Sequence, residues 1–254
     1  MAAANLPEHL RRKMPDGSAL NLTDEVLLAL DVAPTLIADG GFGLVHGPAG
    51  AGKSMVLGVI QAVCPHRVVH VLLEGPLNSK AFDDRIYRAL TGTAMEGTES
   101  SIEDAIAVEL SNAPTLLVVD EAQNVSPSTL LALRRFSDMS HAPFGVQLAC
   151  LGSTKNLQRN TALWDRVLEP IELPPLSGAQ LVSKLAGFHP LLAGADPQLL
   201  FDIDDAYCHG SWRAWAQFVN SHRRKIGSDM PLTKTSAELT LRHNSKFNPG
   251  GLRP

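Results

Sequence analysis

The sequence predicts an α/β protein: a parallel sheet flanked by helices on both faces, followed by a small all-helical segment. Three observations predict this fold. Short, almost continuous apolar runs alternate with amphipathic stretches, as in buried parallel strands joined by helices. A glycine-rich loop pattern follows the first of these runs and opens a helical stretch. After Pro174-Pro175, helical patterns follow one another with no strand-like run between them.

The order of the elements follows from these patterns. Residues 24–38 carry apolar residues at helical spacing, and Pro34 is expected to break this helix because proline lacks an amide donor. Helices are then expected at residues 54–64, 80–90, 102–112 and 127–139. Strands are expected at residues 43–46, 67–74, 115–120 and 145–152, with a last edge strand at 169–175.

Four segments are expected along the chain. Residues 1–34 form an N-terminal extension, 35–175 the α/β core and 176–226 a helical lid. Residues 227–254 are polar with little periodicity, so they are expected to be a basic, largely disordered tail with one short helix near 235–243.

Length and composition limit the class of protein. A chain of 254 residues with 44% hydrophobic residues can bury one ample core and is not disordered in composition. Cys64, Cys150 and Cys208 lie far apart, which argues against a disulfide framework and a zinc cluster. No apolar run is long enough to span a membrane, and the first residues lack the apolar centre of a signal peptide. We therefore expect a soluble, cytoplasmic protein.

The net charge of −4 hides an asymmetry. From His209 to the end there are eight Lys/Arg and two Asp/Glu, a charge of +6, which leaves −10 for residues 1–208. A basic end on an acidic body suggests a polyanionic partner. A solvated tail that only aids solubility explains the charge equally well.

Residues 47–54 read GPAGAGKS and match the phosphate-loop pattern GxxxxGK[ST]. The glycines permit a tight loop whose backbone N–H groups converge on phosphate oxygens at the start of a helix. Lys53 is expected to reach the β- and γ-phosphates of ATP, and the Ser54 hydroxyl to ligate Mg²⁺. The residues expected to surround the nucleotide are Gly47, Pro48, Ala49, Gly50, Ala51, Gly52, Lys53, Ser54 and Met55.

The second half of the expected site is TLLVVDEAQNV, residues 115–125. A carboxylate at the tip of a buried strand is costly unless it meets a cation. We therefore expect Asp120 to bind Mg²⁺ through water and Glu121 to act as the base that orients the attacking water. The alternative is a pair of acids favoured by a helix N-terminus. Gln123 and Asn124 receive no certain role.

Further candidates follow the third buried strand, GVQLACLG. Ser153 and Thr154 come at its carboxyl end, where ligands gather in open parallel sheets, so they are candidates for sensing the γ-phosphate or holding water. Capping of the next helix is an equally good explanation. Nine histidines form no metal-binding or nucleophile motif, which leaves metal-hydrolase and acyl-transfer readings without support.

Three arginines are candidates for contacting the nucleotide. Arg166 is the first choice, and Arg159 the second, for an arginine supplied to a neighbouring subunit's nucleotide. A surface salt bridge of Arg166 with Asp165 or Glu169 is the alternative. Arg213, at a predicted helix start in the lid, is a candidate for reaching the phosphates of its own site.

Together these motifs resemble those of AAA+ ATPases: GPAGAGKS resembles Walker A, VVDE Walker B, LGST the first sensor and GSWR the second. The stretch DEAQNVSPSTLLALRRFSDM further resembles the MuB/TniB/TnsC-type transposition ATPases and the related ExeA-type ATPases. The resemblance covers roughly residues 35–226.

The resemblance implies a function. Members of the transposition group bind ATP and Mg²⁺, form rings or helical filaments on duplex DNA, and recruit or activate a transposase. Hydrolysis drives disassembly and helps to select target DNA. Arg134, Arg135 and the basic end are compatible with sequence-independent phosphate contacts. The loop at residues 91–101 departs from this expectation, because it contains Glu96 and Glu99 and no basic residue.

A second function class stays open: an AAA+ ATPase that acts on protein partners, such as a helicase loader or an ExeA-like secretion ATPase. Secretion relatives usually carry a membrane span and a cell-wall-binding domain, and neither is expected here. A nucleotide-gated scaffold with negligible turnover is a third reading, which the presence of Glu121 argues against.

Overall fold

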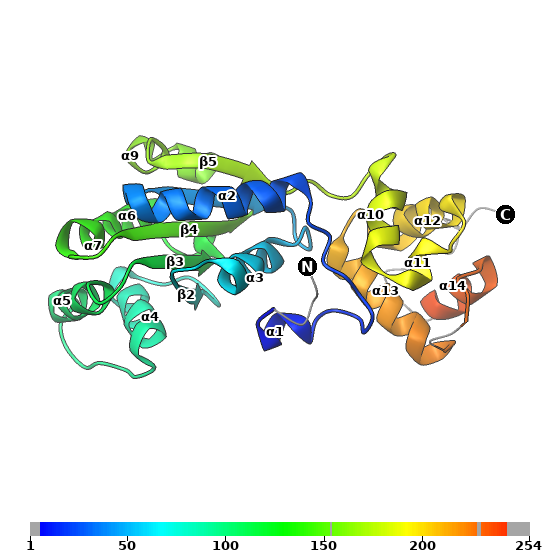
Figure 1. Cartoon of the computed structure of the whole chain (residues 1–254), viewed down its shortest axis with the longest axis horizontal. Helices are drawn as coiled ribbons and strands as arrows, with labels where there is room; N and C mark the ends of the chain where they lie inside the picture. The colour runs from blue at the N-terminus through cyan, green and yellow to red at the C-terminus, as the bar shows by residue number, and fades with distance from the viewer. Residues whose placement is uncertain (1–5, 153, 228–229, 243–254) are drawn as a thin grey trace. The chain divides into compact units, whose positions relative to one another are not determined.

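The structure, a computed structural model, describes residues 6–152, 154–227 and 230–242 (Figure 1). The described chain divides into two compact units, each of which is treated by itself below. The sheet unit consists of Asp24–Gly47 and Lys53–Leu173. The helical unit consists of the described parts of Met1–Thr23, Pro48–Gly52 and Pro174–Pro254.

The sheet unit holds five parallel strands in the order β2-β3-β4-β1-β5, so the predicted α/β fold is confirmed. Parallel pairing requires a crossover between successive strands, and the helices supply these crossovers. Pro170 lies on the edge strand β5, where a missing amide donor is tolerated. The strands are β1 (Phe42–Gly47), β2 (Arg67–Leu72), β3 (Thr115–Asp120), β4 (Phe144–Leu151) and β5 (Val167–Glu172).

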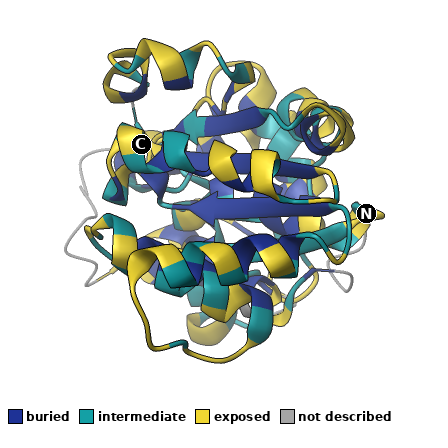
Figure 2. Ribbon diagram, turned by 90° about the vertical axis from the view of Figure 1, so that its left-hand side faces the viewer, coloured by how far each residue is buried: buried dark blue, intermediate teal, exposed yellow. Residues whose placement is uncertain are grey.

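Both faces of the sheet are covered by helices, and β1, β3 and β4 are buried along nearly their whole length (Figure 2). Alternate residues of a strand point to opposite faces. Phe42 and Leu44 belong to the cluster that is packed against α4 to α9. On the opposite face α2 approaches closely, because a Cβ on Gly145 would lie 2.4 Å from the backbone of Leu36. The helices of the sheet unit are α2 (Asp24–Asp39), α3 (Lys53–Val63), α4 (Ser79–Thr91), α5 (Glu99–Leu110), α6 (Pro127–Ala132), α7 (Arg134–Met139), α8 (Lys155–Gln158) and α9 (Thr161–Trp164). The segment η2 (Ala122–Asn124) is a 3₁₀ turn.

The break expected at Pro34 does not occur, since α2 runs without interruption over Asp24–Asp39. Proline removes one helical hydrogen bond, but packing can outweigh that cost. Ala29, Ala33 and Ile37, on both sides of the proline, are buried. Burial of this face holds both halves in one helix.

The single helix expected at 127–139 is two short helices, α6 (Pro127–Ala132) and α7 (Arg134–Met139). At the junction the backbone changes to tighter i→i+3 hydrogen bonds, from Leu133 N to Leu130 O and from Phe136 N to Leu133 O. This change lets Leu130, Leu133 and Phe136 all enter the core.

The helical unit packs around its own core, in which Trp215 is fully buried and meets Phe218 edge-to-face with ring centroids 5.8 Å apart. Helix α12 (Pro197–Ile203) continues into a wider π turn, Asp204–Cys208. The other helices of this unit are α1 (Glu8–Arg11), α10 (Gln180–Phe188), α11 (Pro190–Ala193), α13 (Trp212–Lys225) and α14 (Lys234–Leu241).

The short helix expected near 235–243 is present as α14, and it is part of the core of the helical unit. Leu232, Ala237 and Leu241 are buried there. Lys225 of α13 donates hydrogen bonds from Nζ to the carbonyl oxygens of Thr240 (2.6 Å) and Arg242 (3.2 Å), a cationic cap on the end of α14. Within the stretch expected to be a tail, this part is therefore folded, and 243–254 lie outside the described residues.

The cysteines and the apolar helices were both considered from the sequence. The three cysteines are free, in agreement with their spacing in the sequence. None of the helices in the described part of the chain has both the length and the apolar character that crossing a bilayer requires.

Candidate nucleotide-binding site

The phosphate-loop residues connect β1 to α3, as their pattern predicts. Gly50 and Gly52 have φ angles of +81° and +104°, a region in which a Cβ atom is strained. The Lys53 side chain is buried, and Nζ donates a 2.9 Å hydrogen bond to Gly47 O at the end of β1. The other predicted loop residues, Pro48, Ala49, Ala51 and Met55, lie in the turn and in the first turn of α3.

Ser54 and Asp120, which are 66 residues apart in the chain, are in direct contact in the sheet unit. The Ser54 hydroxyl donates a 2.7 Å hydrogen bond to Asp120 Oδ2, and Asp120 Oδ1 accepts one of 2.9 Å from the Glu121 N–H. Asp120 is 4% exposed, at the carboxyl end of a fully buried strand. A hydroxyl and a carboxylate are the oxygen donors that Mg²⁺ uses beside a nucleotide, so these residues fit that ion.

Glu121 has an unusual backbone conformation, with φ +59° and ψ +40°. A non-glycine residue in the left-handed region is uncommon and is found disproportionately at functional sites. The turn that it makes ends β3 and directs the chain into η2. The carboxylate accepts a short hydrogen bond from Gln123 Nε2.

Gln123 and Asn124 hold this turn to the neighbouring strands, a role that the sequence did not reveal. Gln123 Oε1 accepts a 3.0 Å hydrogen bond from the N–H of Leu151, at the end of β4. Asn124 Nδ2 donates one of 2.7 Å to Leu73 O, just after β2. The side-chain amides thus join the carboxyl ends of β2, β3 and β4. Their position directly after the acidic pair was the only signal, and it did not identify the partners.

Known proteins share features of sequence and fold with the chain. Residues 37–160 match the family model of the AAA domain. The Aeropyrum pernix Orc1 protein in complex with DNA has a TM-score of 0.62 and is 14% identical, over 90% of this chain and 67% of that one. The Thermotoga maritima RuvB Holliday junction branch migration motor has a TM-score of 0.55 and is 15% identical, over 93% of this chain and 72% of that one. The chain has the AAA+ P-loop fold.

Another similar structure is a Walker-type ATPase of Pyrococcus abyssi, with a TM-score of 0.53 and 12% identity, over 82% of this chain and 69% of that one. No curated protein sequence matches the chain. At identities this low, the structural likeness extends to the AAA+ fold and not to partners or substrates.

Of the two hydroxyl residues expected after β4, Ser153 lies outside the described residues. Thr154 precedes α8, and its side chain makes no capping hydrogen bond to that helix. Its backbone oxygen accepts a 3.0 Å hydrogen bond from Gln158 N. The capping role considered for Thr154 is therefore not seen, and its hydroxyl remains a candidate for contacting the nucleotide.

Arg166 lies at the end of the AAA+ sheet where the parallel strands begin, whereas the phosphate loop follows the carboxyl end of β1. Its carbonyl accepts a 3.2 Å hydrogen bond from Phe42 N at the start of β1, whereas Gly47 ends that strand. At about 3.3 Å per residue, β1 separates the two edges by roughly 17 Å. Arg166 Nε is buried without a hydrogen-bond partner, and the salt bridge considered as the alternative is not found among the described residues. Arg166 is therefore remote from Gly47 of its own chain.

Arg159, the second candidate, is exposed between α8 and α9. Its Nη1 is 3.5 Å from Asn156 Oδ1, at the long limit of a hydrogen bond. It lines a pocket of about 440 Å³ with Ser128 at the start of α6 and Thr161 at the start of α9. Nothing in this setting distinguishes it from a surface arginine.

Arg213 belongs to the helical unit, as the loop residues Pro48–Gly52 do. Its backbone N–H donates a 3.4 Å hydrogen bond to Gly50 O. Ser211 caps α13 by accepting a 3.3 Å hydrogen bond from Ala214 N. Half-buried Asp204 accepts bonds of 2.9 Å from Gly210 N and from Trp215 Nε1. The start of α13 is thus fixed by capping and by a half-buried carboxylate.

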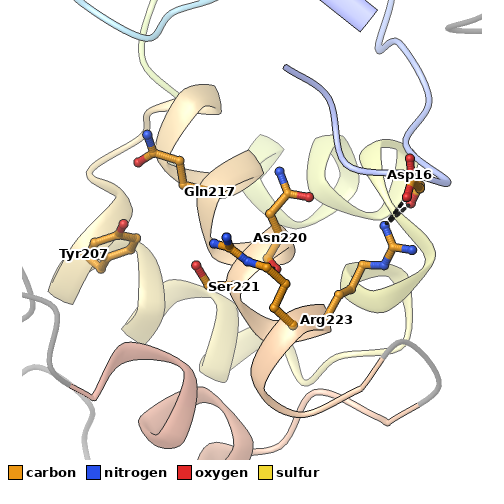
Figure 3. Close-up of a pocket in the computed structure, with 7 residues that line it drawn as sticks. Asp16, Tyr207, Gln217, Asn220, Ser221 and Arg223 are labelled. Carbon is orange, nitrogen blue, oxygen red and sulfur yellow. Dashed lines mark hydrogen bonds and ion pairs between the residues drawn. The ribbon is translucent and has the colours of Figure 1, made fainter. Parts of the chain in front are cut away.

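Many basic residues considered for DNA contact already have partners. Arg134 pairs with Asp138 at 4.0 Å, and Arg135 pairs with Glu103. In the helical unit, Arg223 pairs with Asp16 at 3.2 Å (Figure 3). That pair borders a pocket of about 660 Å³, also lined by Tyr207, Gln217, Asn220, Ser221 and Arg224. Exposed ion pairs are weak, so these arginines can exchange their carboxylate partners for phosphate groups.

Proposed function

We propose that the chain is a Mg²⁺-dependent ATPase that assembles on duplex DNA and regulates DNA transposition. The observation that carries the nucleotide part is the hydrogen bond from Ser54 to Asp120, which brings the phosphate-loop helix and the acidic strand end together. The two groups are poised to share one Mg²⁺ with ATP. Bound Mg²⁺ would supply charge neutralisation at the β- and γ-phosphates.

The chain's own groups have separable tasks in this proposal. The backbone N–H groups of residues 47–52 and the Lys53 ammonium hold the phosphates. The Glu121 carboxylate orients the attacking water and accepts its proton. Gln123 fixes that carboxylate in place through its own anchor on Leu151. Arg213 and Thr154 are proposed to contact the nucleotide, as is Ser153.

Assembly is proposed from the position of Arg166 and from the transposition-type motif. An arginine at the sheet edge opposite its own phosphate loop can serve a neighbouring subunit, which requires a ring or filament. Among similar structures, Orc1 was solved in complex with DNA and RuvB is a Holliday junction motor, which supports duplex DNA as the partner. The stretch DEAQNVSPSTLLALRRFSDM supports a transposase as the protein that the assembly recruits or activates.

The test is sedimentation velocity combined with negative-stain microscopy of the full chain. Samples contain ATP or ADP, with and without a nonspecific duplex. The expected result is a large assembly that requires ATP and DNA together, and that weakens steeply as salt rises because phosphate contacts release counterions. Assembly with ATP but without any effect of DNA would instead favour an ATPase that acts on protein, such as a helicase loader. Failure to assemble under any condition would overturn the proposal.

A further inference from the structure

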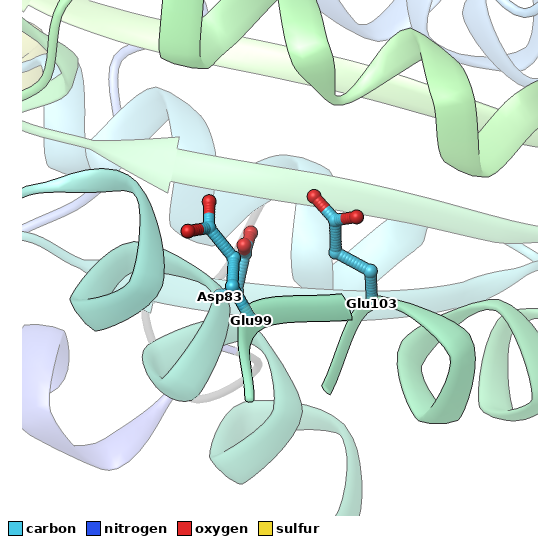
Figure 4. A group of neighbouring side chains, drawn as sticks. All are labelled: Asp83, Glu99 and Glu103. Carbon is cyan, nitrogen blue, oxygen red and sulfur yellow. The ribbon is translucent and has the colours of Figure 1, made fainter. Parts of the chain in front are cut away.

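Three carboxylates on two helices of the sheet unit converge (Figure 4). Asp83 lies on α4, and Glu99 and Glu103 lie in the first part of α5. One carboxylate oxygen from each residue lies within 4.8 Å of those of the other two. The three side chains point to the same side of the two helices.

Asp83 is the buried member of this cluster. The residue is 5% exposed, and its Oδ2 is buried with no hydrogen-bond partner in the described part of the chain. A buried charge without a counter-charge is strongly destabilising. A cation beside Asp83 would supply the contact that this buried oxygen lacks.

Helix geometry explains only part of the cluster. Glu99 is in the first turn of α5, where the helix dipole favours an acid. Neither Asp83, in the first half of α4, nor Glu103, one turn further along α5, gains from that dipole. The convergence of all three groups is left without an explanation in local structure.

Charge and spacing both fit a divalent cation. Glu103 pairs through Oε1 with Arg135, which leaves its second oxygen available. With all groups ionised, the three carboxylates and this guanidinium sum to −2. Ca²⁺ binds oxygens at about 2.3–2.6 Å, so ligands on opposite sides of the ion lie about 5 Å apart, whereas Mg²⁺ at about 2.0–2.1 Å requires closer ligands. Oxygens within 4.8 Å of one another lie inside the span of about 5 Å that Ca²⁺ allows, so the cluster fits an ion of that size.

We propose that Asp83, Glu99 and Glu103 form a binding site for a divalent cation of the size of Ca²⁺. Water completes its coordination on the exposed side, where Glu99 lies. The ion links α4 to α5 and so fixes the acidic loop between them. This site shares no residue with the Ser54–Asp120 pair, and it does not depend on the proposed ATPase function.

The test is isothermal titration of Ca²⁺ into the full chain, freed of metal and nucleotide, with Mg²⁺ as the comparison ion. We expect one saturable Ca²⁺ site that is tighter than the Mg²⁺ site. Glu99→Gln should weaken Ca²⁺ by about tenfold, since affinity follows the number of charged ligands. Glu96→Gln is the matched control, because Glu96 is an exposed acid of the same loop outside the cluster. Asp120→Asn, which disables the nucleotide site, should leave Ca²⁺ binding unchanged.

Thermal unfolding supplies a second readout. Ca²⁺ should raise the melting temperature of the wild-type chain but not that of Asp83→Asn. In the absence of metal, Asp83→Asn should itself melt at a higher temperature than wild type, because it removes an unpaired charge. Exposed Glu99 gives a further variant if Asp83→Asn fails to fold. Absence of saturable Ca²⁺ binding, or equal binding by wild type and Glu99→Gln, would overturn the proposal.

Discussion

Gln123 donates a hydrogen bond to the Glu121 carboxylate while its own oxygen accepts one from Leu151 N, so that β4 anchors the acid at the end of β3. Both bonds come from a single side-chain amide. An amide held at both ends has few rotamers available, and it restricts the carboxylate that it contacts.

Replacing Gln123 by Ala should lower the kcat of ATP hydrolysis by about tenfold, with little change in KM. A tenfold loss corresponds to about 1.4 kcal/mol of transition-state stabilisation, a reasonable value for misorienting a catalytic base. Steady-state kinetics of phosphate release measures both constants. Gln158→Ala is the control, because Gln158 is exposed on α8. An increase in kcat would show that Gln123 restrains Glu121 instead of orienting it.

Lys53→Ala should abolish measurable ATP binding. Lys53 directly follows the loop glycines and is buried, and its ammonium donates a hydrogen bond to Gly47 O. Titration with a fluorescent ATP analogue checks the affinity, and circular dichroism checks that the fold is kept. Lys13→Ala, an exposed position in the N-terminal segment, should bind ATP normally. Unchanged ATP affinity in Lys53→Ala would refute the phosphate-loop assignment.

Glu121→Gln should bind ATP and turn it over at least about a hundredfold more slowly, because the base that accepts the proton is lost. Slow turnover should trap the assembled state, which sedimentation detects as a larger species with ATP. Near-normal turnover would remove Glu121 from the role of base.

Mixing Arg166→Ala subunits with Glu121→Gln subunits should partly restore hydrolysis. In a mixed assembly, some interfaces pair an intact Arg166 with an intact Glu121 from a different chain. The phosphate release rate of the mixture is compared with that of each variant alone. Arg159→Ala in the same experiment tests the second candidate. A mixture no faster than its parts would contradict a role across an interface.

The helical unit should lose stability as the pH falls below about 6.5. Burial lowers the pKa of His222, whose Nε2 lies 3.2 Å from Ser236 Oγ, and burial also lowers the pKa of His189. Below a pH of about 6.5, the pKa of histidine in an unfolded chain, the unfolded state therefore binds more protons than the folded state. The free energy of unfolding falls as the pH falls through this range.

Urea titrations at pH 7.5 and 5.5 measure this effect. His222→Gln should show a smaller loss of stability between the two pH values than wild type does. His66→Gln, at an exposed position after α3, should lose as much stability as wild type. An equal loss in His222→Gln and wild type would assign the pH dependence to other groups.

Local patterns predicted the elements well where they reflect local forces. Apolar runs predicted β1 to β4, because a strand covered on both faces is largely apolar. The edge strand expected at 169–175 is β5, which covers Val167–Glu172. The glycine-rich loop predicted where β1 meets α3, because only such a sequence adopts those backbone angles. Local patterns were misleading where packing decides. Pro34 favoured a break, and burial of α2 against the sheet kept the helix intact.

The sequence by itself determined the fold class and the chemical groups of the nucleotide site, since residue types and spacing are enough to specify a phosphate loop and an acidic strand end. Only the tertiary structure decided which groups meet. Strand order brings β3, β4 and β1 side by side, so Ser54 reaches Asp120 and Gln123 reaches Leu151. Tertiary packing also places Arg166 at the amino end of the strands, away from Gly47. It brings Asp83 close to Glu99 and Glu103. Contacts of this kind depend on how helices and strands pack, and no short stretch of sequence encodes them.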